Sequence, residues 1–308
     1  MTEYRYQKAA LIFLIPDPCL LPSEGFTLVE MAVVLIVIGL IVLAVFPALT
    51  ALRMSGQRTL TQSNLNSLMR ATAAYAEANG CLPCPTPAST IGSGFGRVRG
   101  DGSASPAACG ACAAPEGIAP FMSLGLPAEA ARDGWGHWIT MRVDPALTVN
   151  PANSANPVGV VPPFAPCTAA DLAASPVTAS CRLQGASQKG LCRTGLAAAG
   201  RIDVTTPGNA NPQQTAVIFV SYGAQGYGSF SASVNLTGTN GAQLPFPSSM
   251  PACSASEGFT RCNAAGTTQF VDAPITVGGG DPYDDLLAYA DRNTLLSMFG
   301  NGSCQTVW

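Results

Sequence analysis

The most constraining feature of the sequence is an unbroken apolar run near the N-terminus. Residues 26–46 read FTLVEMAVVLIVIGLIVLAVF, and only Thr27, Glu30 and Gly39 among them are not hydrophobic. As an α-helix the run is about 31 Å long, which matches a bilayer core of about 30 Å. A buried helix of a soluble protein is the alternative, but apolar runs of this length are rare there. The run therefore predicts a membrane-spanning helix with one acid inside it.

The helical pattern continues beyond Pro47 but becomes amphipathic. Its apolar residues recur mostly at spacings of three to five, with charged and amide residues between them: Leu52, Leu60, Leu65, Leu68, Met69, Ala73 and Ala76. Asn79-Gly80 is a stop signal, because glycine favours the left-handed conformation that ends many helices. We expect one helix over 26–79, about 80 Å long, with a kink at Pro47 where proline displaces a backbone hydrogen bond.

The rest of the chain, residues 80–308, is rich in Gly, Pro, Ala, Ser and Thr. Its short apolar runs predict strands at 137–143, 216–222, 228–236 and 268–271. Residues 284–299 predict either a strand and a short helix or one helix, whereas 144–166 and 197–214 are expected to be loops. Short strands after one long helix indicate an α+β class with an antiparallel sheet.

The charge of the chain excludes one functional class. The sequence has 15 Lys and Arg residues against 18 Asp and Glu, a formal net charge of −3. Proteins that bind nucleic acid normally present a basic face to the phosphates, so we expect no nucleic-acid partner. Eleven cysteines exceed what a cytosolic enzyme needs, which favours an oxidising compartment.

The residues just before the apolar run resemble the cleavage and methylation signature of type IV prepilins and pseudopilins. This stretch, 23–30, reads SEGFTLVE. In that family a prepilin peptidase cuts after the glycine, the new N-terminal phenylalanine is methylated, and the glutamate directs filament assembly. The resemblance implies processing at Gly25 and Phe26 and an assembly role for Glu30. A free amine at Phe26 of one subunit would neutralise Glu30 of its neighbour in the filament core.

The resemblance also implies an overall organisation. Residues 1–25 are the cleaved leader, 26–79 the spine helix with its transmembrane part at about 26–46, and 80–308 a periplasmic or extracellular head rich in β-structure. The expected fold is therefore pilin-like: a half-transmembrane spine packed on an antiparallel sheet with long, disulfide-stapled loops. Such a protein is held in the bacterial inner membrane by one span, with its C-terminal head in the periplasm, and then enters a pilus or pseudopilus.

Three further stretches resemble family features less specifically. Asn79–Pro85 (NGCLPCP) is similar to a stretch that follows the spine in a group of prepilin-like proteins. Asp133–Gly136 (DGWG) resembles a turn before a strand in pseudopilins and minor pilins. Asp284 and Asp285 resemble paired acids near the C-terminus of those proteins.

The cysteines suggest disulfides, with zinc and redox chemistry as alternatives. If Cys19 leaves with the leader, an even set of disulfide candidates stays: Cys81, Cys84, Cys109, Cys112, Cys167, Cys181, Cys192, Cys253, Cys262 and Cys304. Closeness in sequence favours the pairs Cys181–Cys192 and Cys253–Cys262. Cys81-x-x-Cys84 and Cys109-x-x-Cys112 have the spacing of a zinc site, but the export signal favours disulfides, either within each C-x-x-C or between them.

Other candidate sites carry weaker signals. Asp281, Asp284 and Asp285 could supply oxygen ligands to calcium, and the simpler reading is a solvated turn in which Asp284 caps a helix. The only histidine, His137, stands between tryptophans at the start of a predicted strand, where a structural role is expected. The stretch 223–228 (GAQGYG) reads as a turn between strands.

The function predicted from these features is structural. We expect a minor pilin or pseudopilin, a non-enzymatic assembly subunit of a type IV pilus or type II secretion pseudopilus. Its expected partners are the prepilin peptidase and N-methyltransferase, other pilins or pseudopilins, and the inner membrane. One alternative is a pilus-borne adhesin whose head is a binding module. Another is a membrane-anchored zinc or thiol-redox protein that uses the C-x-x-C pairs.

Overall fold

The computed structural model describes part of the chain. The described residues are 27–79, 81–90, 92–103, 108–148, 202–209, 211–230, 243–253, 259–263, 268–276 and 283–298. The chain divides into two compact units, Met1–Leu52 and Arg53–Trp308, and the boundary falls inside helix α1 (Leu28–Asn79). We refer to the second unit, including its part of α1, as the head.

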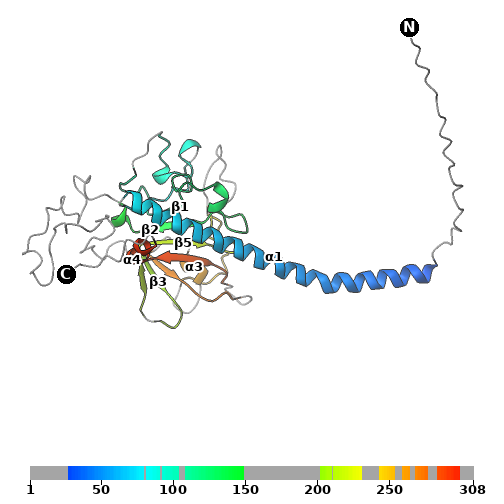
Figure 1. Ribbon diagram of the computed structural model, residues 1–308. Helices are drawn as coiled ribbons and strands as arrows, with labels where there is room; N and C mark the ends of the chain where they lie inside the picture. Colours follow the sequence, from blue (N-terminus) through cyan, green and yellow to red (C-terminus); the bar gives the residue numbers. More distant parts are fainter. Residues whose placement is uncertain are drawn as a thin grey trace, which may run out of the picture. The chain divides into compact units, whose positions relative to one another are not determined.

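Helix α1 confirms the long helix expected over 26–79, apart from its first residues. It is the longest element in Figure 1. The helix is continuous through Pro47, whose side chain lies outside the described residues, so the kink there stays a prediction.

The expected membrane span is wrong. No helix in the described part of the chain is both long enough and apolar enough to cross a membrane. Beyond residue 52 the helix carries Arg53 and Arg58. The transmembrane half of the spine at 26–46 and the single-pass placement in the inner membrane are therefore both corrected.

The head is built on a four-stranded sheet with the order β1-β2-β5-β7. Its strands are all antiparallel: β1 (Glu116–Ile118), β2 (Thr140–Val143), β5 (Val217–Ser221) and β7 (Leu286–Ala290). The strands expected at 137–143 and 216–222 are confirmed as β2 and β5. At 284–299 the strand-and-helix alternative is correct, because β7 is followed by α4 (Arg292–Ser297).

A second, three-stranded sheet was not expected. Its order is β4-β3-β6, from β4 (Gln213–Thr215), β3 (Ile202–Thr205) and β6 (Gln269–Val271), with β3 and β6 parallel. The expected loop at 197–214 is thus wrong, whereas the strand expected at 268–271 is confirmed. Short elements complete the described head: α3 (Phe259–Asn263) and 3-10 turns at Gly92–Gly94, Val98–Gly100, Ala128–Ala131 and Pro145–Leu147.

The two faces of the four-stranded sheet bury different partners. One face packs against α1 through a core that includes Leu65, Leu68, Met69, Met141 and Phe219. The other face packs against the second sheet through Ile202, Val204, Ile218, Val220, Tyr222 and Phe270. The amphipathic pattern is confirmed from Leu65 onward, but Leu52 and Leu60, which belong to the same pattern, are exposed.

Candidate functional site

Helix α1 begins with a reciprocal hydrogen-bonded cap. The backbone N–H and the hydroxyl of Thr27 donate to Glu30 Oε2 at 2.9 and 3.0 Å, and the backbone N–H of Glu30 donates to Thr27 Oγ1 at 3.3 Å. This is the T-x-x-E capping box, which satisfies donors that a helix start leaves free. These bonds from Thr27 hold the pKa of Glu30 below its usual value. Glu30 is thus ionised and already partnered within its own chain.

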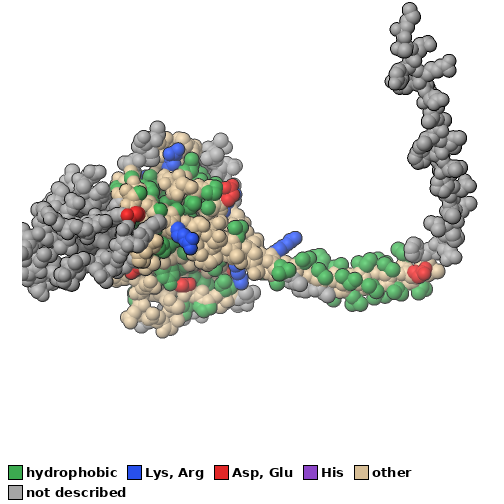
Figure 2. Space-filling model, viewed as in Figure 1, with side chains coloured by type: hydrophobic (Ala, Val, Ile, Leu, Met, Phe, Trp, Pro, Cys, Tyr) green, Lys and Arg blue, Asp and Glu red, His purple; other side chains and the backbone are tan. Residues whose placement is uncertain are grey.

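The apolar segment, residues 28–52, exposes its large side chains. Figure 2 shows them as a green surface along this part of α1. The exposed large hydrophobic residues of the segment are Leu28, Val29, Met31, Val33, Val34, Leu35, Ile36, Val37, Ile38, Leu40, Ile41, Val42, Leu43, Val45, Phe46, Leu49 and Leu52. Glu30 is the only charged residue in the segment. Exposed apolar surface on this scale marks an interaction site in a folded protein.

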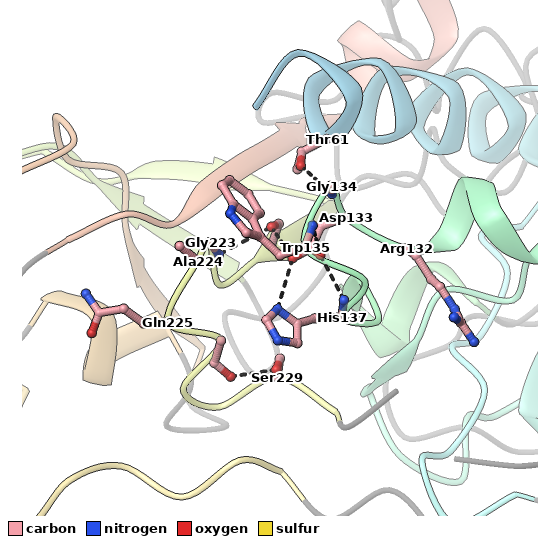
Figure 3. A network of polar contacts seen from close by, with 12 residues as sticks. Thr61, Arg132, Asp133, Gly134, Trp135, His137, Gly223, Ala224, Gln225 and Ser229 are labelled. Carbon is pink, nitrogen blue, oxygen red and sulfur yellow. Dashed lines mark hydrogen bonds and ion pairs between the residues drawn. The ribbon is translucent and has the colours of Figure 1, made fainter. Parts of the chain in front are cut away.

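The Asp133–His137 turn is organised by one buried carboxylate (Figure 3). Asp133 Oδ1 accepts hydrogen bonds from the backbone N–H groups of Trp135 and His137 at 3.0 and 2.9 Å. Asp133 Oδ2 accepts a bond from Ser221 Oγ in β5 at 2.8 Å and lies 3.6 Å from His137 Nδ1. The DGWG stretch is therefore an Asx-type turn that the sheet holds in place.

The same turn contacts α1. The backbone N–H of Gly134 donates to Thr61 Oγ1 at 2.8 Å, and that hydroxyl donates to the carbonyl of Gln57 at 2.8 Å. A Cβ at Gly134 would overlap the Gln57 backbone, so only glycine fits this approach. Asn64 Nδ2 adds bonds to the carbonyls of Arg132 and Glu129 at 2.7 and 3.0 Å. These contacts lock the head part of α1 to the turn.

The Ser221, Asp133 and His137 side chains do not form a nucleophile site. In an activated-serine site the hydroxyl bonds to the histidine and the acid orients that histidine. Here the Ser221 hydroxyl bonds to the acid instead. The nearby carboxylate of Asp133 raises the pKa of His137 against the opposing effect of burial. His137 also packs on Gly226, where a Cβ would overlap its ring, which fits the structural role expected for it.

Asp284 and Asp285 each accept hydrogen bonds from a different segment of the head. Asp284 Oδ2 accepts bonds from the backbone N–H groups of Ala224 and Gln225 at 2.7 and 3.2 Å, and burial raises its pKa. It therefore caps a turn within the predicted turn 223–228 rather than a helix. Asp285 is buried and accepts a bond from Asn263 Nδ2 at 2.8 Å.

The calcium site at Asp281, Asp284 and Asp285 stays a prediction. Asp281 lies outside the described residues, and Asp284 and Asp285 accept hydrogen bonds from the Ala224 N–H and from Asn263 Nδ2. Among the described residues no group of three or more His, Cys, Asp or Glu side chains is placed to hold a metal ion. The helix cap is made by a different acid, Asp291, whose Oδ1 accepts the Thr294 N–H of α4 at 2.7 Å.

The two C-x-x-C pairs are joined to each other by disulfides. Cys81 bonds to Cys109 and Cys84 to Cys112, each across 28 residues. The alternative in which the pairs cross-link is therefore correct, and these thiols are not free to bind zinc. The expected Cys253–Cys262 bond is confirmed. The other candidates lie outside the described residues: Cys167, Cys181, Cys192 and Cys304.

The proposed processing residues Gly25 and Phe26 also lie outside the described residues. No family model matches the chain, and no curated protein or solved structure matches it significantly.

Proposed function

We propose that the protein is a subunit of a pilin-like filament, a minor pilin or pseudopilin with a structural and assembly role. The observation that carries the proposal is the apolar segment 28–52, whose large side chains are exposed on the helix. Covering these side chains in a complex is favourable because it removes apolar surface from water. A helix that is apolar all round must be covered on every side, and a bundle of copies of the same helix provides that cover.

The single charge of the segment supports assembly in a defined register. An unpaired carboxylate in an apolar core is strongly unfavourable, so Glu30 needs a cation when the segment is buried. The resemblance of residues 23–30 to prepilins suggests the partner, which is the free amine of Phe26 in a neighbouring subunit. In a lone chain, Thr27 bonds to the same carboxylate. In the assembly, the amine of a neighbouring subunit then replaces Thr27 as the partner of Glu30 or shares the carboxylate with it.

The attachment of the head to α1 supports the same role. A subunit that assembles through the N-terminal part of α1 needs a head that stays firmly attached to the rest of the helix. Gly134 of the turn donates a hydrogen bond to α1, and Asn64 of α1 donates one to the residues just before the turn. The disulfides Cys81–Cys109 and Cys84–Cys112 fix the chain that directly follows the helix. Disulfide stapling of this kind suits a protein that works in an oxidising compartment.

Processing tests the proposal. The full chain is co-expressed with an active prepilin peptidase, and the N-terminus is read by intact mass and peptide sequencing. The expected product begins at Phe26 and carries one added methyl group. Gly25→Val blocks the cut, and Ser23→Ala, as the matched control, does not. A chain that stays uncut while the same peptidase processes a known prepilin contradicts the proposal.

A further inference from the structure

A groove of about 510 Å³ lies beside the C-terminal end of α1. Helix α1 lines one part of it with three alanines, Tyr75 and Asn79, and later segments of the chain line the rest and include Arg97 and Ser123. Small-molecule sites in proteins have volumes of about 300–1,000 Å³. The groove is therefore large enough for a small ligand, and its lining mixes apolar and hydrogen-bonding side chains.

Three polar side chains of the groove keep hydrogen-bonding capacity for a ligand. Arg97 Nε donates to a backbone carbonyl at 3.0 Å, but Nη1 and Nη2 have no hydrogen-bond partner among the described residues. Ser123 Oγ accepts a backbone N–H at 3.0 Å and retains its own proton to donate. Asn79 Nδ2 donates to a backbone carbonyl at 2.9 Å, which leaves Oδ1 as an acceptor. An apolar ligand would cover these groups without pairing them, which is unfavourable.

The charges around the groove have both signs. Hydrogen bonds from Ser103, and then the charges of Arg99 and Arg97, lower the pKa of Asp101, so this acid is ionised near the two arginines. Burial raises the pKa of Tyr75 to about 12 against the opposing charge of Arg99, so the Tyr75 hydroxyl is neutral near pH 7. An anionic ligand would meet Asp101 as well as the arginines. The groove therefore favours a polar ligand without a net charge.

We propose that this groove binds a neutral oligosaccharide. Sugar hydroxyls both donate and accept hydrogen bonds, so they match the donors of Arg97 and Ser123 and the acceptor of Asn79. Sugar rings also have apolar C–H faces, which fit the alanine surface of α1 and the ring of Tyr75. The inference adds a ligand site to the head and does not depend on how the apolar segment 28–52 assembles.

The groove is held in shape before any ligand arrives. The Tyr75 hydroxyl donates to the Ala108 carbonyl at 2.7 Å, which joins two of the lining residues. The Cys81–Cys109 bond ties the chain just after α1 to the residue next to Ala108, and Cys84–Cys112 repeats the link three residues further on each side. A preformed site loses little conformational entropy when it is filled, which favours binding of a small ligand.

Calorimetric titration of the full-length chain tests the site. The neutral probes are maltotriose, cellotriose and triacetylchitotriose, and the acidic probe is trigalacturonic acid. At least one neutral trisaccharide is expected to bind, and more tightly than the acidic one. Arg97→Met keeps the length of the side chain but removes its donors, so it should raise the dissociation constant about tenfold. Arg70→Met is the matched control, because Arg70 is exposed on α1 and does not line the groove.

A second pair of variants fills the groove instead of changing its donors. Ala74→Trp places a large side chain in the groove and should abolish binding, whereas Asn66→Trp adds a tryptophan to α1 outside the groove and should not. Ala74 and Asn66 are both exposed, so both variants should melt as wild type does. The inference is overturned if no neutral trisaccharide binds wild type, if trigalacturonic acid binds more tightly than all of them, or if Arg97→Met and Ala74→Trp bind as their controls do.

Discussion

Thr27 and Glu30 bind each other across the first turn of α1, with the Thr27 N–H donating to Glu30 Oε2 at 2.9 Å and the Glu30 N–H donating to Thr27 Oγ1 at 3.3 Å. The acid that the prepilin resemblance assigns to assembly is thus also the N3 glutamate of a capping box whose N-cap is Thr27. The helix can begin directly after the proposed cleavage site without help from another subunit. Glu30 then has two roles, a local one in the lone chain and an intermolecular one in the assembly.

Removing the hydroxyl of Thr27 is expected to loosen the start of α1. In Thr27→Val the Glu30 N–H loses its side-chain acceptor, and the carboxylate loses one of its two donors. Amide hydrogen exchange at Glu30 and Met31 should become about fivefold faster, as expected for loss of a helix cap. Thr27→Ser keeps the hydroxyl and should exchange as wild type does. Equal rates in the valine and serine variants contradict the capping role.

Replacing Asp133 is expected to destabilise the head. Asp133→Ala leaves the half-buried N–H groups of Trp135 and His137 and the buried Ser221 hydroxyl without their acceptor, a loss of about 3 kcal/mol in the free energy of unfolding. Ser221→Ala removes one bond of the same network and should lose only about 1 kcal/mol. Urea denaturation followed by tryptophan fluorescence measures both. A smaller loss for Asp133→Ala than for Ser221→Ala contradicts the assignment of Asp133 as the centre of the turn.

The pH dependence of stability should carry a contribution from His137. Its pKa is raised in the folded chain from the ordinary value of 6.5, chiefly by Asp133. The folded state therefore binds the proton more tightly than the unfolded state. The resulting stabilisation is complete below about pH 6.5 and is lost as the pH rises through the folded pKa.

Urea denaturation of wild type and His137→Gln from about pH 5.5 to about pH 8.5 isolates the contribution of His137 to stability. The nearby acids are present in both proteins, so their effect on stability cancels in the comparison. The stability advantage of wild type over the variant should shrink as the pH rises. An advantage that is constant, or that grows with pH, contradicts the raised pKa.

Two glycines near the junction of α1 and the turn should respond in opposite directions to alanine. A Cβ at Gly134 would overlap backbone atoms of Gln57, so Gly134→Ala must push the turn away from α1 and lower stability by about 1–3 kcal/mol. Gly56 is inside α1 with nothing within 4 Å of its added Cβ. Gly56→Ala should therefore raise stability by about 0.5–1 kcal/mol. Thermal denaturation compares them, and a neutral Gly134→Ala would show that the close approach is not required.

Much of the fold follows from local sequence patterns, and the exceptions have physical causes. The apolar run and the Asn79 stop predict α1 closely, and the runs at 137–143 and 216–222 predict β2 and β5 because both strands are buried. Strand β3 has the alternation of a half-buried strand in Ile202 and Val204, but it is only four residues long and lies in a segment rich in Pro, Asn and Gly. Its partner β6 lies 66 residues away, and no local pattern encodes that pairing.

The candidate site was only partly visible in the sequence. The spacing of Thr27 and Glu30 is a capping-box signal that could have been recognised beside the assembly motif. The bond between Asp133 and Ser221 joins residues 88 positions apart, and the pairing of Asp284 with the turn at Ala224 spans 60. Such contacts depend on which strands become neighbours. The C-x-x-C pairing was ambiguous for the same reason, because spacing alone does not separate local from crossed disulfides.

The most direct test of the central proposal is the assembly state of the processed chain when the apolar segment carries a charge. Wild type, Leu35→Glu and the head control Met122→Glu are compared by sedimentation velocity and negative-stain electron microscopy. Leu35 and Met122 are both exposed, so neither change should unfold the head. Assembly through the apolar segment predicts that wild type and Met122→Glu form filaments or oligomers, whereas Leu35→Glu stays monomeric. Equal assembly of Leu35→Glu and wild type would contradict it.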